Sequence, residues 1–190
     1  MRSFRPILLV LVIAVLVTAA IVAVSQPAGP FDRAQAPEEP SAIVGQLGGA
    51  TRSIDAVGDL AFVGIGQRLV ILRLRPDGPP VLLGQSPAFG ADVQDVSADG
   101  GLVAAAVGVR GVILVNVADP ETPQVVGHLG TDWFAGGAAL QDGRLYVADG
   151  AEGLQIADVS DPSAPINLGG VDTPGDALAV AIDGDLAVVG

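Results

Sequence analysis

Few side chains in this sequence are of the types that perform nucleophilic, acid–base or metal chemistry. The 190 residues contain no Cys and a single His, His128. The lack of Cys excludes a thiol nucleophile, a disulfide framework and Cys-based zinc or iron–sulfur sites. No carboxylate and serine accompany His128 in the sequence, as a hydrolytic triad would require. No catalytic residue and no cofactor is therefore predicted, and His128 is interpreted as a surface residue at the end of a strand.

Acidic residues are the commonest ionisable groups, 21 against 9 basic ones, and give a net charge of -12. Nucleic-acid binding needs a basic stripe, so this charge argues against a nucleic-acid partner. Calcium prefers closely spaced oxygen ligands, and Asp183-Gly184-Asp185 superficially offers them. However, Asp-Gly is an ordinary hairpin turn, and no calcium loop of the D-x-[DN]-x-[DN]-G type is present. These acids, and Asp149 in the segment Asp149-Gly150, are predicted to be turn residues, and no metal site is expected.

An apolar run near the N-terminus predicts a transmembrane helix over residues 7–24. At about 1.5 Å rise per residue this run spans about 27 Å, close to the thickness of the hydrocarbon layer. Arg2 and Arg5 precede the run, which predicts a cytoplasmic N-terminus and an extracytoplasmic C-terminal part. Two alternatives remain for residues 1–25. They form an uncleaved single-pass anchor in the cell membrane, or a signal peptide cleaved after Ser25 so that the remainder is secreted.

Residues 26–42 are rich in proline and charge and poor in apolar groups. Such a segment is stiff and buries too little apolar surface to offset the entropy lost on ordering. It is therefore predicted to be a linker between the membrane segment and a folded unit at residues 43–190.

Three kinds of marker recur along residues 43–190 at intervals of about 42 residues. The turn glycines lie 42, 43 and 41 residues apart, and the prolines lie 43 and 42 apart. Three markers in one register indicate an internal repeat. The markers are the turn glycines Gly58, Gly100, Gly143 and Gly184, the prolines Pro80, Pro123 and Pro165, and the closing glycines Gly84, Gly127 and Gly169. The predicted units are residues 51–84, 92–127 and 134–170, with half a unit at 177–190.

Each unit reads as four short strands separated by turns. Inner strands such as residues 102–107 are apolar at every position, so they need cover on both faces. Four-stranded sheets stacked around an axis supply that cover, and a period of roughly 40–45 residues is typical of propeller blades. The predicted fold class is all-β, a partial β-propeller of about three and a half blades preceded by one transmembrane helix.

The third unit resembles the LVIVD repeat of bacterial and archaeal surface proteins. The resemblance rests on the segment LQIADVSDPSAP at residues 154–165 and on YVADG at 146–150. A second copy begins at Val112, and a first copy at residues 69–76 has drifted further. The resemblance extends over residues 43–190 and implies an extracytoplasmic β-propeller whose biochemical role is poorly defined.

The most informative position of this motif is Asp158, which is Asn116 in the second copy and Arg73 in the first. Asp158 and Asn116 precede Asp-Pro loops that contain Pro162 and Pro120. They are predicted to hydrogen-bond to the backbone of these loops, and so to be residues of the fold and not a catalytic pair.

The fourth unit reaches only its second predicted strand, and three and a half blades do not close a ring. The sequence is therefore expected to be a truncated piece of a longer protein, with an open strand edge that favours aggregation. Residues 43–47 match the fourth, outer strand at 125–129. Assembly of several copies into a closed ring is the alternative.

Aromatic residues in the loops between blades are the candidates for partner binding. Phe89, Trp133 and Phe134 lie where propeller loops face the mouth of the central channel. Exposed there, they would anchor a partner; alternatively they fill the blade junctions as core. The sequence favours a binding or scaffold module, and not an enzyme, with an unknown protein or glycan partner. The alternative is a fragment of a propeller hydrolase or dehydrogenase whose catalytic residues lie in missing blades.

Overall fold

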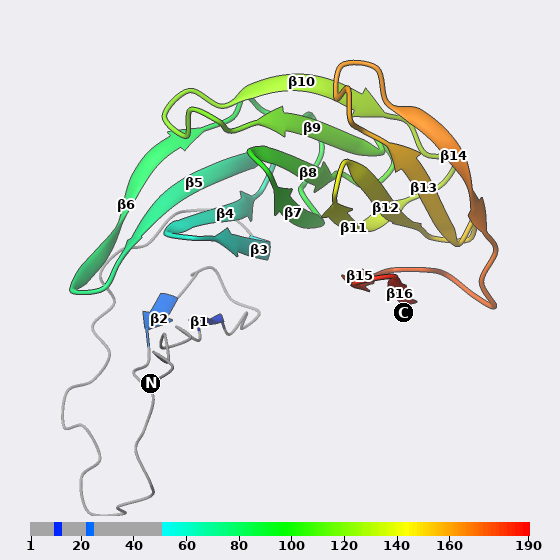
Figure 1. Cartoon of the computed structure of the whole chain (residues 1–190), viewed down its shortest axis with the longest axis horizontal. Helices are drawn as coiled ribbons and strands as arrows, with labels where there is room; N and C mark the ends of the chain where they lie inside the picture. Colours follow the sequence, from blue (N-terminus) through cyan, green and yellow to red (C-terminus); the bar gives the residue numbers. More distant parts are fainter. Residues whose placement is uncertain (1–9, 13–21, 25–50) are drawn as a thin grey trace, which may run out of the picture.

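Strands make up all the regular structure in the computed structural model, which describes residues 10–12, 22–24 and 51–190. Three four-stranded antiparallel sheets and a two-stranded sheet follow one another along residues 51–190. Figure 1 shows them side by side in an arc, with the first strand of each four-stranded sheet on the inner side and the fourth on the outer side. This propeller-like arrangement confirms the predicted all-β class and its four-stranded repeat.

Each four-stranded sheet is a meander, because strands that follow one another in the sequence are paired. Blade 1 consists of β3 (Thr51–Val57), β4 (Leu60–Ile65), β5 (Arg68–Arg75) and β6 (Gly78–Gln85). Blade 2 consists of β7 (Asp95–Asp99), β8 (Leu102–Ala106), β9 (Val112–Asn116) and β10 (Gln124–Leu129). Blade 3 consists of β11 (Ala135–Gln141), β12 (Arg144–Asp149), β13 (Leu154–Asp158) and β14 (Ile166–Val171). The half-blade consists of β15 (Val180–Asp183) and β16 (Leu186–Val189).

Two of the three buried apolar clusters lie between blades, and the third belongs to blade 1 alone. One buried cluster joins blade 1 to blade 2 and includes Phe62 and Val103. A second joins blade 2 to blade 3 and includes Ala104 and Leu145. Successive side chains of a strand point to opposite faces, so Val103 packs in the first cluster and Ala104 in the second. Burial on both faces explains why the central strands are apolar at every position.

Hydrogen bonds from backbone N–H groups to side chains tie the inner strands of neighbouring blades together. Three acceptors alternate along β7, and each takes its hydrogen bond from a residue 43 positions later in blade 3. The pairs are Asp95 Oδ2 with Ala138 N at 3.0 Å, Ser97 Oγ with Leu140 N at 2.9 Å, and Asp99 Oδ2 with Asp142 N at 2.9 Å. Asp55 Oδ2 accepts from Ala98 N in the same way, at 2.8 Å.

Burial raises the pKa of Asp95 above its ordinary value, although N–H bonds from Ala138 and Val96 act in the opposite direction. The neighbouring charge of Asp55 raises the pKa further. The junction therefore contains an acidic side chain whose acceptor atoms are bonded and whose charge is only partly compensated.

Glycines of the outer strands make room for the backbone of the following blade. A Cβ at Gly84 of β6 would overlap the carbonyl oxygen of Pro120, and a Cβ at Gly127 of β10 would overlap that of Pro162. Pro120 and Pro162 belong to the loops that join the third and fourth strands of blades 2 and 3. The closing glycine of one repeat and the Asp-Pro loop of the next are thus two sides of one contact.

The hairpin turn between the first and second strands shows that one predicted marker, the turn glycine of blade 3, is misaligned by one residue. The last residues before the turn are 42 positions apart in all four units: Val57, Asp99, Gln141 and Asp183. The next residue has a positive φ, and in blade 3 it is Asp142 at 52°, not Gly143. Asp tolerates this left-handed conformation better than most side chains. Gly143 occupies the second turn position, as Gly101 does in blade 2, so the intervals of 43 and 41 residues are an effect of this exchange.

The predicted transmembrane helix at residues 7–24 is not supported. Val10–Val12 and Val22–Val24 form two short strands, β1 and β2, which pair with each other. Valine favours extended backbone, and an apolar run without polar alternation has no period that distinguishes a helix from strands. In the part of the chain that the structure describes, no helix is long and apolar enough to cross a membrane. The rest of residues 7–24, the linker at 26–42 and the strand expected at 43–47 lie outside the described residues.

The contact between the outer-strand glycine Gly127 and the Asp-Pro loop of blade 3 leads to a first prediction. Gly127→Ala is expected to lower the free energy of unfolding by about 1–3 kcal/mol, because its Cβ meets rigid backbone that must shift. Gly78→Ala in β6 is the control, since a Cβ there meets nothing within 4 Å. Urea unfolding measures both variants, and equal stabilities would contradict the contact.

Candidate functional site

Of the three loop aromatics, Trp133 alone is largely open to solvent. Phe89 is 5% exposed and belongs to the core between blades 1 and 2. The ring of Phe134 lies against Gly108 and is partly buried. Trp133 is 58% exposed, and its indole lies beside Gly150, where a Cβ would overlap it. Phe89 therefore fills a blade junction, Phe134 packs against the connector at Gly108, and Trp133 is the exposed candidate anchor.

A buried carboxylate holds the backbone of the Trp133 loop. Asp149, at the end of β12, is 1% exposed. Its Oδ2 accepts a hydrogen bond from Asp132 N at 3.0 Å, and its Oδ1 accepts one from Trp133 N at 3.2 Å. Because both N–H groups are fixed by an acceptor that cannot move, the exposed indole starts from a defined backbone position.

The repeat itself contains the signal for this residue. Asp149 N donates to Gly153 O as Val107 N donates to Gly111 O, both at 2.8 Å, so the two residues are equivalent. Val107 is fully buried. An Asp in place of a buried Val requires hydrogen-bonding partners. The sequence interpretation took Asp149-Gly150 only as a turn and missed this role.

We call the end of the blades that carries Trp133 the connector face; it comprises the loop 130–134 and the connectors 107–111 and 150–153. Isolated β-bridges tie each connector to the chain that leads into the next sheet, Gly108 to Ala135 at the start of β11 and Gly150 to Ala177 before β15. Val109 is 75% exposed in its connector. The connector face is therefore built on short, mutually hydrogen-bonded segments that present Trp133.

His128 has a structural partner near this face. Its Nε2 lies 2.6 Å from the carbonyl oxygen of Arg110, and a carbonyl can only accept, so the ring donates. The bond joins the outer strand β10 to the connector that follows β8. This geometry gives His128 a role in fixing that connector.

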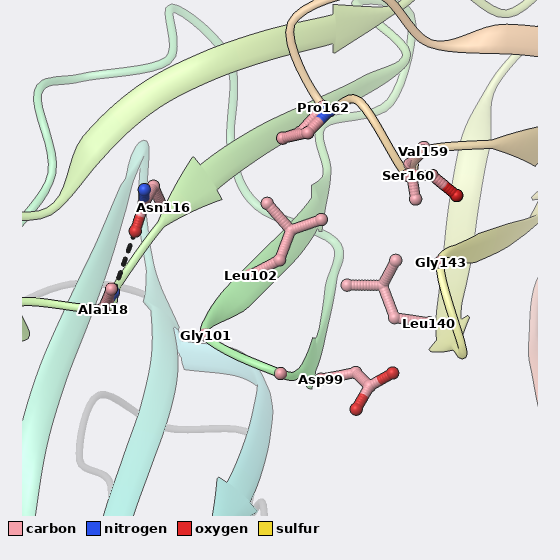
Figure 2. Close-up of a pocket in the computed structure, with 11 residues that line it drawn as sticks. Asp99, Gly101, Leu102, Asn116, Ala118, Leu140, Gly143, Val159, Ser160 and Pro162 are labelled. Carbon is pink, nitrogen blue, oxygen red and sulfur yellow. Dashed lines mark hydrogen bonds between the residues drawn. The ribbon is translucent and has the colours of Figure 1, made fainter.

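A cleft of about 340 Å³ lies between blades 2 and 3, at the end of the blades that is opposite the connector face (Figure 2). Its polar groups are largely used by the fold. Asn116 Oδ1 accepts from Ala118 N at 2.9 Å, and Asp99 Oδ2 accepts from Asp142 N at 2.9 Å. The lining residues are Asp99, Gly100, Gly101, Leu102, Asn116, Ala118, Leu140, Gly143, Val159, Ser160 and Pro162.

Ser160 is the one hydroxyl among these lining residues, and its neighbour Asp158 is a poor general base. Asp158 Oδ1 accepts from Ser160 N at 2.9 Å. This bond and one from the Ser160 side chain lower the pKa of Asp158 below its ordinary value. A base that works near neutral pH needs a pKa near that pH. The arrangement stabilises the Asp-Pro loop, as Asn116 does in blade 2.

Trp133, the single Trp of the chain, allows a direct test of the Asp149 interaction. Asp149→Ala leaves the N–H groups of Asp132 and Trp133 without their acceptor, at a cost of about 1–3 kcal/mol in stability. Fluorescence anisotropy of Trp133 is expected to fall in this variant, because the loop is released. Glu152→Ala, an exposed acidic residue of the same face, is the control. Unchanged anisotropy in Asp149→Ala would refute the role of the carboxylate.

Comparison with known proteins identifies the repeat type of blade 3. Residues 135–173 match the family described as LVIVD repeat. The match covers blade 3 and confirms the resemblance seen in its sequence. Within residues 51–190, no group of three or more His, Cys, Asp or Glu side chains is placed to hold a metal ion. No curated protein matches the chain.

Solved structures of similar fold include two designed proteins and one natural enzyme. The computationally designed protein Ika8 has 11% identity and a TM-score of 0.63, over 77% of this chain and 44% of its own. The designed protein Ika4 has 15% identity and a TM-score of 0.57, over 75% and 85%. Glutaminyl cyclase from Myxococcus xanthus has 15% identity and a TM-score of 0.53, over 74% and 60%. The chain thus spans less than half of Ika8, and identities this low show the fold alone. The chain carries an LVIVD repeat at residues 135–173, set in a propeller-like β fold.

Proposed function

We propose that this chain is an extracytoplasmic binding or scaffold module that presents its connector face to a protein or glycan partner. The observation that carries the proposal is the exposed Trp133 on a loop fixed by the buried Asp149. Tryptophan is enriched among the residues that dominate binding energy, because it buries a large area with few rotatable bonds. A fixed backbone reduces the entropy that binding would otherwise lose.

The proposed location rests on the N-terminal sequence. Arg2 and Arg5 precede the apolar run at residues 7–24, a charge pattern typical of export with the N-terminus retained inside. The acidic charge of the chain disfavours adsorption to anionic lipid, so the apolar run would supply the membrane attachment.

An enzymatic function has less support than a binding function. In the described residues the cleft pairs its hydroxyl, Ser160, with an acid whose pKa is lowered, and His128 is bonded to a backbone carbonyl. The similarity to glutaminyl cyclase concerns the fold. The alternative is a fragment of a propeller hydrolase or dehydrogenase whose catalytic residues lie in other blades.

Binding is tested by screening the full chain on arrays of surface glycans and of purified surface proteins. Trp133→Ala is expected to weaken binding of a true partner by about 2 kcal/mol or more, about thirtyfold in Kd. Val57→Ala is the matched control, because Val57 is also an exposed apolar residue but lies at the hairpin turn of blade 1, outside the connector face. A partner that binds both variants with equal affinity would exclude Trp133 as the anchor and would remove the support for this proposal.

The location is tested with alkaline phosphatase fused after Gly190, since this enzyme is active only outside the cytoplasm. The fusion is expected to be active in a bacterial host. Replacement of Arg2 and Arg5 by Glu should lower that activity, because it removes the charge that retains the N-terminus inside. An inactive fusion that accumulates in the cytoplasm would contradict export.

A further inference from the structure

The cleft between blades 2 and 3 combines apolar walls with one acidic side chain. Val159 is 2% exposed and belongs to the core between these blades, and Leu102 and Leu140 pack against the same core. Figure 2 shows Leu102 and Leu140 on either side of the cleft, with the carboxylate of Asp99 below them. At about 340 Å³ the cleft reaches the size of small-molecule sites, about 300 to 1,000 Å³. It can therefore hold one side chain or one small molecule.

Asp99 has a carboxylate oxygen that the fold leaves free. Its Oδ2 accepts from Asp142 N at 2.9 Å, but its Oδ1 accepts no hydrogen bond from the residues that the structure describes. Asp55 and Asp95, which also lie in inner strands, have both oxygens bonded. In each, Oδ2 accepts from the next blade and Oδ1 from the N–H group of the following residue. Both oxygens of an ionised carboxylate can accept, so Asp99 can bind a further donor.

The equivalent place in blade 1 is taken by an arginine side chain. The pairing of β4 with β5 and of β8 with β9 makes Arg73 equivalent to Asn116, and Asp59 equivalent to Gly101. Arg73 faces blade 2, since Ile71 on the same face of β5 packs in the core between blades 1 and 2. The Arg73 Nε lies 3.5 Å from Asp59 Oδ2. A guanidinium beside a turn carboxylate is thus an arrangement that this repeat accommodates.

Blade 2 has short residues at both of these positions. Gly101 has no side chain, and Asn116 turns back onto its own loop, where its Oδ1 accepts from Ala118 N at 2.9 Å (Figure 2). The space that the ion pair fills in blade 1 is therefore open in blade 2, where the acid at the turn is Asp99.

The charges around the cleft are mostly negative. A hydrogen bond from Ser160 N lowers the pKa of Asp158, so this carboxyl is ionised at neutral pH. A hydrogen bond from the Ser163 hydroxyl lowers the pKa of Asp161 in the same way. Arg144 pairs with Asp158 across β12 and β13, which offsets its positive charge. A cleft surrounded by charges of one sign attracts ions of the other sign, so a cation is the expected ligand.

We infer that the cleft between blades 2 and 3 binds a guanidinium group that carries an apolar stem, the chemistry of an arginine side chain. The guanidinium donates to Asp99 Oδ1 and to the hydroxyl oxygen of Ser160, while the stem packs on Leu102 and Leu140. A guanidinium fits better than an ammonium, because it is planar, has five donors and is more weakly hydrated. The cleft lies opposite the connector face, so the inference is independent of the proposed function.

The test titrates the full chain in mild detergent with butylguanidinium and follows the backbone amide signals by NMR. Saturable shifts are expected at Gly101 and Gly143, which line the cleft, and not at Gly58 in the turn of blade 1. Butylurea has nearly the same shape without the charge and should bind about fivefold more weakly or worse. Butylammonium, a cation without the planar fork, should also bind more weakly than butylguanidinium.

A short peptide with one arginine, acetyl-Gly-Arg-Gly-amide, distinguishes two sources of the guanidinium. If the peptide binds at least as tightly as butylguanidinium, the ligand is an arginine side chain of a protein. If butylguanidinium binds and the peptide does not, the ligand is a free guanidino compound. Both results support a guanidinium site.

Removal of the charge at Asp99 tests the proposed acceptor. Asp99→Asn should weaken butylguanidinium binding by about fivefold, while the amide oxygen can still accept from Asp142 N. Asp77→Asn is the matched control. It changes the net charge equally but lies in the outer hairpin of blade 1, so binding should be unchanged.

Two substitutions of Asn116 should change the affinity in opposite directions. Asn116→Arg supplies a guanidinium from the chain itself and should abolish binding. Asn116→Asp adds a negative charge and should strengthen binding by about threefold. Arg73 and Asp158 occupy this position in the other blades, so the fold accommodates both side chains.

Three results would overturn the inference. The first is the absence of saturable shifts at the amides that line the cleft. The second is equal affinity for butylguanidinium and for either butylurea or butylammonium, which would mean that the guanidinium itself is not recognised. The third is an affinity that neither Asp99→Asn nor Asn116→Arg changes, which would place the ligand elsewhere.

Discussion

At both blade junctions the apolar face of one sheet is buried by the neighbouring sheet, and most features of this molecule follow from that contact. The clusters that contain Phe62 and Leu145 lie between blades, and a third cluster, which contains Val63 and Leu72, lies on the other face of blade 1. A strand that is apolar on both faces is stable only where it has neighbours on both sides. Blade 2 has both, and its Val103, Ala104 and Ala105 are fully buried.

Because the junctions determine the packing, an exchange at the end of a strand can change the surface of the molecule and leave the sheet intact. Asp149 shows how a single exchange in a connector changes the surface without disturbing the sheet. It takes the place of a buried valine, and its carboxylate is compensated by two N–H groups of the adjacent loop. The same exchange fixes the backbone of Trp133. The two hydrogen bonds that offset the burial of the Asp149 side chain are also the bonds that hold the loop presenting the indole.

The sequence predicts the strand order and the four-stranded unit well, because turn glycines and apolar strands are local signals. It predicts the junctions less well. The intervals between Gly84, Gly127 and Gly169 were recognised, but their contact with a proline carbonyl depends on how two blades dock. Asp142 adopts a conformation usually reserved for glycine, which shifted the apparent repeat by one residue. The apolar segment at 7–24 has no period from which its secondary structure could be read. Asp149 reads as a turn residue in the sequence because its burial depends on a tertiary contact, the one with the loop that contains Trp133.

The bonds that join the inner strands have a consequence for how such repeats can diverge. Asp55, Asp95, Ser97 and Asp99 all bind backbone N–H groups of the adjoining blade, and these groups are the same whatever side chain the neighbour carries. Substitution of a residue that donates one of these bonds, by any residue except proline, therefore leaves the bond in place. The position of Asp158 illustrates this freedom, since it is Arg73 in blade 1 and forms there an ion pair with Asp59 at 3.5 Å. Duplicated units built in this way can drift apart in sequence, and acquire separate surface chemistries, while they remain interchangeable as building blocks.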